Sequence, residues 1–465
     1  MSSPIIWILF PIILSGGLLV FLKNRKLVYI AGFIISMALT LAAIWLPIDK
    51  AIEFGTTDFK VGSQLSILGR QLILIQEQLP ILAILYGIVA FWIFGAQFVK
   101  SPSLLVPTSL LVTSFLVGSL AVSPFLYAAL FIELAVLISI PLLVQNTQIL
   151  NKGVIRFFIY QTIGMTFLLF TGWLLGGTDT APASREAVLR ILLFLGLGFA
   201  FILAIFPFYS WIPMLTEHED IYSVGLLLIL FPTAILLFVF SFIDNYSWLR
   251  NSIELKQALQ VVGMIMVITG GLWSPFQRHL GRMFGYAVIV ENGLSLIAIG
   301  SMTTNGFHIF TGLFFARFVS FGMWALSLST IKDQLGSLEV SRVLGIGKNG
   351  TLLIIGVLVA QFSIGGLPIL AGFPLRVALL EEISLQSNVA SWAIIIGLAG
   401  IWAASFYSIS IFLKSEKGWG NFFSHSIPVN ILLVLGVIAL IFIGLFPETY
   451  LTIMEKILLA YAHLL

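Results

Sequence analysis

Long apolar runs recur along the whole chain, and no other feature limits its possible folds as strongly. About 14 runs contain roughly 18 or more largely apolar residues, the length that an α-helix needs to cross the hydrocarbon core of a bilayer. These runs lie near residues 4–22, 27–46, 72–99, 103–121, 123–144, 154–176, 188–206, 222–243, 257–274, 284–302, 306–330, 351–380, 390–413 and 428–446. Only 9% of the 465 residues are charged, whereas a soluble domain has roughly a quarter. The sequence therefore predicts an all-α, polytopic membrane protein whose main solvent is the lipid bilayer.

Two segments between and after these runs are not expected to span the membrane. In the loop 47–71, the alternation of polar and apolar residues in DFKVGSQLSI (58–67) predicts a short β-hairpin. The last stretch, 450–465, is apolar but too short to cross a bilayer, so we expect an interfacial helix there.

The positions of lysine and arginine predict the orientation of the chain. Of the 23 basic residues, 13 lie in loops that follow odd-numbered spans and eight lie in loops that follow even-numbered spans or in the C-terminal tail. Because cytoplasmic loops carry the excess of positive charge, the odd-numbered loops are expected in the cytoplasm. Both termini would then be extracytoplasmic. The other two basic residues, Arg317 and Arg376, fall inside expected spans.

Several kinds of chemistry have no support in the sequence. The chain has no cysteine, which excludes disulfides, thiolate metal sites, iron–sulfur ligation and a thiol nucleophile. No motif indicates a nucleotide, haem, metal or nucleic-acid site. The acidic stretch TEHED (216–220) could collect protons or bind a metal, but its spacing favours a solvated cytoplasmic loop, and LGIGKNG (344–350) is typical of a turn. We therefore expect no cofactor on this chain, and any redox cofactor would belong to partner subunits.

Three short stretches together resemble one family of membrane proteins. They are FIEL at 131–134, FPFYSWIP at 206–213 and GLPILAGF at 366–373. Their order and spacing are similar to those of the antiporter-like membrane subunits of respiratory complex I. The same family includes subunits of membrane-bound hydrogenases and of multisubunit sodium/proton antiporters. The resemblance covers essentially the whole chain.

The resemblance implies an architecture of two inverted five-helix repeats, with the seventh and twelfth helices interrupted. The repeats would occupy 103–245 and 246–415. Residues 1–102 would hold three helices and an extracytoplasmic loop, and residues 416–465 the last span and an interfacial tail. An interruption frees backbone groups that lipid cannot satisfy but that water in a cavity can. Pro207 and Pro368 are expected at the two interruptions; the alternative is that each proline only kinks a continuous helix.

Charged residues inside expected spans are the candidate functional groups. A charge at mid-membrane costs about 2.5–3.5 kcal/mol on insertion scales, so such residues either serve a function or pair with a neighbour and lock the packing. The resemblance places five titratable or charged residues on the proton path: Glu133, Glu291, His308, Arg317 and Arg376. We expect Arg376 to pair with a buried carboxylate, first Glu291 and otherwise Glu381 or Glu382.

The sequence departs from the proton-pumping pattern of that family at several positions. In pumping members, the glutamate of the fifth span pairs with a lysine just before the seventh-span proline, a position that is Ile202 here. The lysine of the eighth span is replaced by Pro232 or Thr233, the histidine after the seventh-span proline by Tyr209, and the titratable residue of the twelfth span by Arg376. Isoleucine carries no proton, and arginine stays protonated and repels cations. Glu133 is therefore expected to lack its partner.

The expected function is that of an integral subunit of a complex I-like, redox-driven proton pump in the inner (plasma) membrane of a prokaryotic cell. The chain itself would be non-catalytic and would contribute to proton translocation or to assembly of the membrane arm. Its own proton path is expected to be impaired, and its partners would be other membrane subunits. The alternatives are a subunit of a multisubunit cation/proton antiporter or inorganic-carbon uptake complex, and a non-conducting structural spacer.

Overall fold

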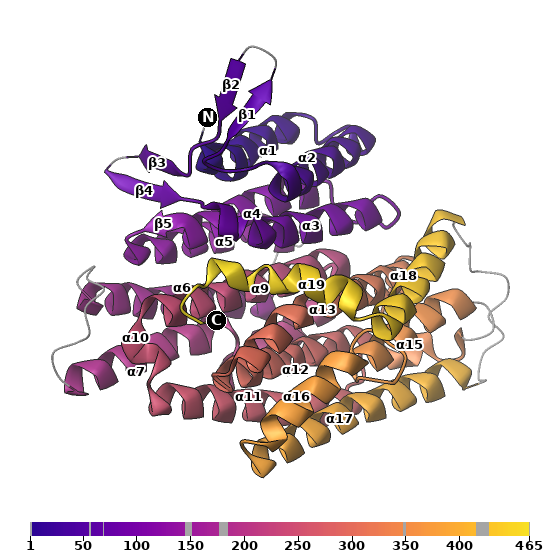
Figure 1. Ribbon diagram of the computed structural model, residues 1–465. Helices are drawn as coiled ribbons and strands as arrows, with labels where there is room; N and C mark the ends of the chain where they lie inside the picture. The colour runs from indigo at the N-terminus through magenta and orange to yellow at the C-terminus, as the bar shows by residue number, and fades with distance from the viewer. Residues whose placement is uncertain are drawn as a thin grey trace.

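The computed structural model describes residues 2–54, 57–67, 69–144, 151–175, 185–346, 350–414 and 427–464. Within these ranges, ten helices are long and apolar enough to cross a membrane, and three shorter apolar helices lie at Ile5–Val20, Leu105–Ala121 and Thr351–Ile364. The helix Arg185–Ile202 accounts for the remaining expected span. Each expected span thus contains a helix, and the all-α polytopic class is confirmed (Figure 1).

The helices follow one another in chain order. They are α1 (Phe10–Val20), α2 (Arg25–Trp45), α3 (Leu79–Ala96), α4 (Leu105–Ala121), α5 (Ala128–Leu143), α6 (Lys152–Leu175), α7 (Arg185–Ile202), α8 (Trp211–His218), α9 (Ile221–Asn245), α10 (Ser247–Arg250), α11 (Ile253–Trp273), α12 (Leu280–Gly300), α13 (Thr304–Leu335), α14 (Val340–Val343), α15 (Thr351–Ile364), α16 (Phe373–Ser384), α17 (Asn388–Leu413), α18 (Ile427–Leu445) and α19 (Glu448–Glu455). A π-helical turn (Ile5–Leu9) leads into α1, and single 3₁₀ turns precede α3, α5 and α8. Helices α9, α12 and α13 are buried along most of their length and form the centre of the bundle.

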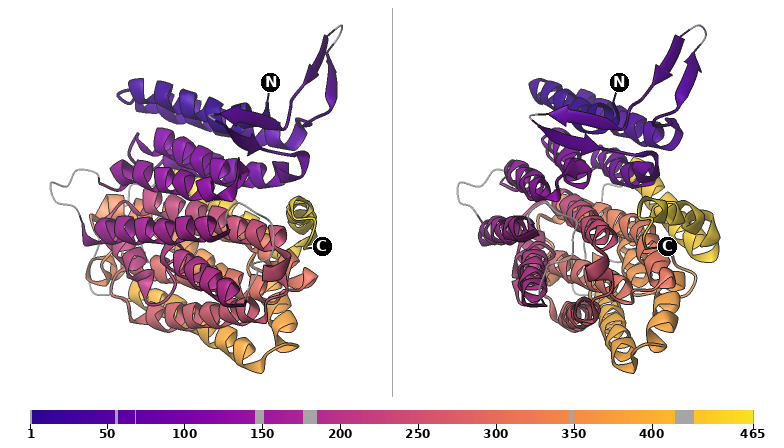
Figure 2. Two further views of the ribbon diagram at one scale, coloured as in Figure 1. Left: turned by 90° about the vertical axis from the view of Figure 1, so that its left-hand side faces the viewer. Right: turned by 60° about the vertical axis from the view of Figure 1, so that its left-hand side comes forward.

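The early loop forms two β-hairpins, not the single one expected. Strands β1 (Ala51–Phe54) and β2 (Thr57–Lys60) pair antiparallel, as do β3 (Gln64–Ile67) and β4 (Arg70–Ile73), with β5 (Val122–Ser123) alongside β4. The expected hairpin fails because its central residue, Gly62, is held elsewhere: its carbonyl accepts a hydrogen bond from the Ser3 backbone N–H at 2.7 Å. The β1–β2 hairpin projects from the bundle beside the N-terminus (Figures 1 and 2).

The seventh and twelfth spans are interrupted, and Pro207 and Pro368 lie in the interruptions. Helix α7 ends at Ile202 and α8 begins at Trp211; α15 ends at Ile364 and α16 begins at Phe373. Each gap holds a non-glycine residue with positive φ, Ala204 at 58° and Ile369 at 78°. Such a conformation is rare for residues with a Cβ and breaks a right-handed helix, so neither proline is a simple kink.

The same pattern of helix packing occurs twice along the chain. Helix α4 packs on α5 and α9, as α11 packs on α12 and α17. Helix α6 packs on both halves of the first interrupted span, α7 and α8, and α13 packs on both halves of the second, α15 and α16.

The C-terminal segment folds back onto the centre of the bundle. Helix α19 packs on α13 and crosses the front of the bundle in Figure 1, in yellow. The Tyr461 hydroxyl donates to the Leu237 carbonyl of α9 at 3.2 Å, and the His463 N–H donates to Asp244 Oδ1 at 2.8 Å. A helix of eight residues, tied down in this way, is consistent with the non-spanning segment expected here.

Candidate functional site

A buried ion pair joins the interrupted twelfth span to the central helix α12. Arg376, in the first turn of α16, donates through Nη2 to Glu291 Oε1. The two side chains are 4% and 0% exposed. Gly366 makes room for the Arg376 side chain, because a Cβ there would lie 3.2 Å from Arg376 Cγ, whereas Gly372 makes room for the backbone, because a Cβ there would clash with the Ser363 carbonyl oxygen. The partner is thus Glu291, as expected.

The two fallback carboxylates lie elsewhere. Glu382 accepts a hydrogen bond from the Thr303 hydroxyl at 2.7 Å, and Glu381 is exposed at the other side of α16. Neither forms an ion pair with Arg376 in the described part of the chain.

A second buried arginine has no acidic partner among the described residues. Arg317 of α13 is 2% exposed, and its Nη2 donates to Oδ1 of Asn292, the residue next to Glu291 on α12. Its Nε and Nη1 make no hydrogen bond to any described residue. This part of the core therefore holds two guanidinium groups and one carboxylate, which leaves a net positive charge in the interior of the bundle.

Glu133 has a partner that the sequence did not suggest. The Thr162 hydroxyl of α6 donates to Glu133 Oε1 at 2.8 Å, while Oε2 is buried and makes no hydrogen bond to the described residues. No lysine pairs with Glu133 among the described residues, but the carboxylate is not without a hydrogen bond, and it contacts Thr162, not the place occupied by Ile202. Ile202 instead accepts, through its carbonyl, from Gln161 Nε2 at 3.1 Å. Consecutive residues of a helix point about 100° apart, so Glu133 and Ile202 meet different faces of α6.

His308 lies away from the Glu291–Arg376 pair. It is in the second turn of α13, about 13 Å along that helix from Arg317. Its ring Nδ1 is 3.8 Å from Glu455 Oε1 of α19, and the side chain is 35% exposed. The structure thus places His308 at the contact with the C-terminal helix, not beside the buried charges.

A small cavity lies at the position where the resemblance implies a lysine in proton-pumping members. It lies beside the first interruption, between α6, α8, α9 and α12, and Ile202 forms part of its wall. The wall is largely apolar, and its polar side chains are those of Gln161, Trp211 and Asn292. Pro232 of α9 also lines it. The hydroxyl of the neighbouring Thr233 donates to the Ile229 carbonyl at 2.7 Å. None of the described residues that line this cavity is titratable.

Residues 126–402 match the family model described as NADH:quinone oxidoreductase/Mrp antiporter, transmembrane. The chain belongs to this family. Among its relatives, the NADH-quinone oxidoreductase subunit N of Nitrosomonas europaea is 22% identical over 343 residues, which are 65% of this chain and 66% of that protein. The corresponding subunit N of Laribacter hongkongensis is 25% identical over 331 residues, 63% of this chain and 64% of that protein. The matches span less than two thirds of either relative.

Solved structures share the fold over nearly the full chain. A chain of the archaeal membrane-bound sulfane sulfur reductase superposes with a TM-score of 0.83 at 17% identity, covering 100% of this chain and 98% of its own. A chain of the Mrp complex from Dietzia sp. gives 0.81 at 12% identity, covering 100% and 99%. A chain of complex I from Thermus thermophilus gives 0.78 at 18% identity, covering 99% of each. At these identities the likeness establishes the fold alone.

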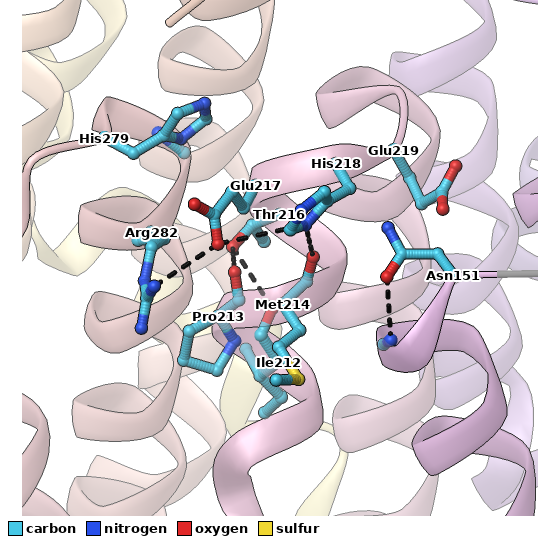
Figure 3. A network of polar contacts seen from close by, with 12 residues as sticks. Asn151, Ile212, Pro213, Met214, Thr216, Glu217, His218, Glu219, His279 and Arg282 are labelled. Atoms are coloured by element: carbon cyan, nitrogen blue, oxygen red, sulfur yellow. Dashed lines mark hydrogen bonds and ion pairs between the residues drawn. The ribbon is translucent and has the colours of Figure 1, made fainter. Parts of the chain in front are cut away.

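This member of the antiporter-like family carries a charged network at one end of the bundle (Figure 3). The stretch TEHED was expected to be a solvated loop, but residues 216–218 form the last turn of α8, and Asp220 caps α9 by accepting from the Ser223 N–H at 3.0 Å. Arg282 of α12 lies 3.3 Å from Glu217 Oε2, and the Lys332 ammonium of α13 donates to the Glu219 carbonyl at 2.7 Å. The stretch is structured because the ends of four helices, α8, α9, α12 and α13, meet there.

His279 is held neutral at the start of α12. Its Nδ1 accepts from the Gly281 N–H at 3.1 Å and so caps the helix, which requires an unprotonated nitrogen. Burial, and then the positive charges of Lys332, His218 and Arg282, lower the pKa of His279 from 6.5 to about 4. The ring is therefore a structural cap at neutral pH.

Acid is expected to destabilise the protein through His279. Between pH 6.5 and about 4, the unfolded chain binds more protons at this residue than the folded chain. The free energy of unfolding therefore decreases as the pH is lowered through this window, whereas above pH 6.5 the contribution of His279 to stability is fully present. His279→Asn keeps a capping oxygen but cannot titrate, so its thermal midpoint should fall less between pH 7 and pH 5 than that of the wild type. Equal slopes would mean that other groups carry the acid sensitivity.

Proposed function

We propose that the chain is a membrane subunit of a complex I-like, redox-driven proton pump, and that it supports the membrane arm without a complete proton path of its own. The observation that carries this proposal is the Glu291–Arg376 pair at the interrupted twelfth span. The relatives named subunit N supply the link to a quinone oxidoreductase. An arginine in this place holds a carboxylate permanently and passes no proton on.

The repeated packing supports two inverted repeats, at 103–245 and 246–415. Each unit contributes five spans, the fourth of which is interrupted, and the same pairs of helices pack in both units. Because five is an odd number, the second unit enters the membrane from the side opposite to the first. Residues 1–102 and 416–465 would then be additions at the two ends of this core.

The charged network supports the proposed orientation. Glu217, Arg282 and Lys332 come from three segments that each follow an odd-numbered span, and the contacts of Arg282 with Glu217 and of Lys332 with the Glu219 carbonyl bring these helix ends together. This end would face the cytoplasm of a prokaryotic cell, with both termini on the outer side of the plasma membrane. The expected partners are other membrane subunits, which would carry or contact the redox cofactors.

Both halves of the expected proton path lack a group that the mechanism needs. In the first half, Glu133 accepts a hydrogen bond from a threonine, and no titratable side chain lines the cavity beside the interruption in the described part of the chain. In the second half, the carboxylate of Glu291 is neutralised by Arg376, and Arg317 adds a fixed positive charge that repels protons. A subunit with these features contributes packing and insulation more readily than conduction.

Glu133→Gln is expected to leave most of the proton translocation of the host complex intact. Glutamine keeps the shape of the side chain and can still accept from Thr162, so assembly should also be unaffected. The measurement is the number of protons translocated per electron in vesicles, with Thr162→Val as the matched control for the lost hydrogen bond. Loss of pumping by a fully assembled Glu133→Gln complex would refute the proposed impairment of the first half.

A further inference from the structure

Three residues that line the small cavity beside the first interruption each have a polar side-chain atom with no hydrogen-bond partner among the described residues. These atoms are Trp211 Nε1, Gln161 Oε1 and Asn292 Nδ2. The side chains are deeply buried, with exposures of 4%, 1% and 0% respectively. Buried polar groups are nearly always satisfied, by protein or by ordered water, so three such atoms around one cavity require an explanation.

The roles of these atoms as donor or acceptor are fixed by their other contacts. Gln161 Nε2 donates to the Ile202 carbonyl, which leaves the side-chain oxygen as the free atom. Arg317 donates to Asn292 Oδ1, and because arginine cannot accept, the free atom of Asn292 is its NH₂ group. The indole N–H of Trp211 only donates. The cavity therefore offers two donors and one acceptor.

We propose that this cavity binds one water molecule, which accepts from Trp211 and Asn292 and donates to Gln161. The cavity volume is about 20 Å³, above the 10–15 Å³ or so that a single water needs. Two donors and one acceptor match the three hydrogen bonds that a buried water typically makes. The water would connect the interrupted seventh span to Asn292 and, through it, to Arg317.

Other small occupants match the cavity less well. A sodium ion or hydronium needs oxygen acceptors, whereas the unpartnered side-chain atoms of the lining residues are one oxygen and two N–H groups, with the positive Arg317 next to Asn292. A chloride ion would meet the oxygen of Gln161 at close range. The water site follows from the lining of the cavity alone and does not depend on the proposed function.

Two tryptophan variants test this site by thermal denaturation of the purified chain or complex. Trp211 and Trp324 are both buried, both pack against phenylalanine rings and both have an unpartnered indole N–H, but only Trp211 lines the cavity. Each change to phenylalanine removes similar apolar area. Trp211→Phe also removes one of the water's three hydrogen bonds, so its melting temperature should fall by about 2 °C more than that of Trp324→Phe.

A cryo-electron microscopy map that resolves ordered water gives a direct second measurement. We expect one peak within hydrogen-bonding distance of Trp211 Nε1, Gln161 Oε1 and Asn292 Nδ2 in the wild-type protein. An empty cavity in such a map would overturn the proposal, as would a peak that disappears when chloride is removed. Equal melting temperatures of the two variants would also overturn it, since a dry cavity gives Trp211 no hydrogen bond to lose.

Discussion

Arg376→Ala is expected to reduce the amount of assembled protein severely, because it leaves the Glu291 carboxylate alone in the interior of the bundle. Glu291 is fully buried, and Arg376 is the group that neutralises it. Removing one partner of a buried pair typically costs about 3–5 kcal/mol, a large share of the roughly 5–15 kcal/mol that stabilises a folded protein. The measurement is the yield of this chain in the membrane and in the purified complex, relative to the wild type.

Two further variants separate charge from packing. Arg185→Ala removes an arginine that is 86% exposed and paired with Glu254 at the surface, and it should leave the yield unchanged. The double variant Glu291→Leu/Arg376→Leu removes both charges together and should recover part of the yield, since apolar residues often replace a buried ion pair at little cost. A normal yield of Arg376→Ala would show that the pair does not hold α16 against α12.

The fold could be predicted from the sequence because hydrophobic length determines it. Each apolar run of sufficient length became a helix, and the prolines at 207 and 368 marked the two interruptions. The early loop was predicted less well. Between its two hairpins, the Gly62 carbonyl accepts a hydrogen bond from the Ser3 N–H, a contact between residues far apart in the chain that no local alternation reveals.

The sequence predicted the contact between two charged residues of the candidate site, but not the contacts made by its neutral polar residues. In an apolar span, an arginine and a glutamate stand out, so the Glu291–Arg376 pair could be anticipated. A search for charge does not single out the amides of Gln161 and Asn292 or the hydroxyl of Thr162, although a polar residue next to Glu291 on a buried helix is a usable signal. The position of His308 beside Glu455, away from the buried ion pair, could not be predicted, because it depends on where α19 folds back.

Ile202→Lys is expected to lower assembly and not to restore a proton path. The side chain at this position is 5% exposed and faces the apolar cavity that Gln161 lines. A lysine ammonium there would find one acceptor, Gln161 Oε1, for its three donors, and burying a charge without a partner costs several kcal/mol. Arg317 donates to Asn292, which also lines the cavity, so its positive charge would further repel the lysine ammonium.

Glu133 cannot relieve that charge, because it contacts Thr162, which points to another side of α6 than Gln161. A lysine at position 202 therefore does not recreate the glutamate–lysine pair that the resemblance implies for pumping members. Ile202→Met, which is unbranched and uncharged, controls for the change of shape and should assemble more completely than Ile202→Lys. The measurements are the yield of assembled complex and the protons translocated per electron. A fully assembled Ile202→Lys complex with increased translocation would show that the first half lacks only its lysine.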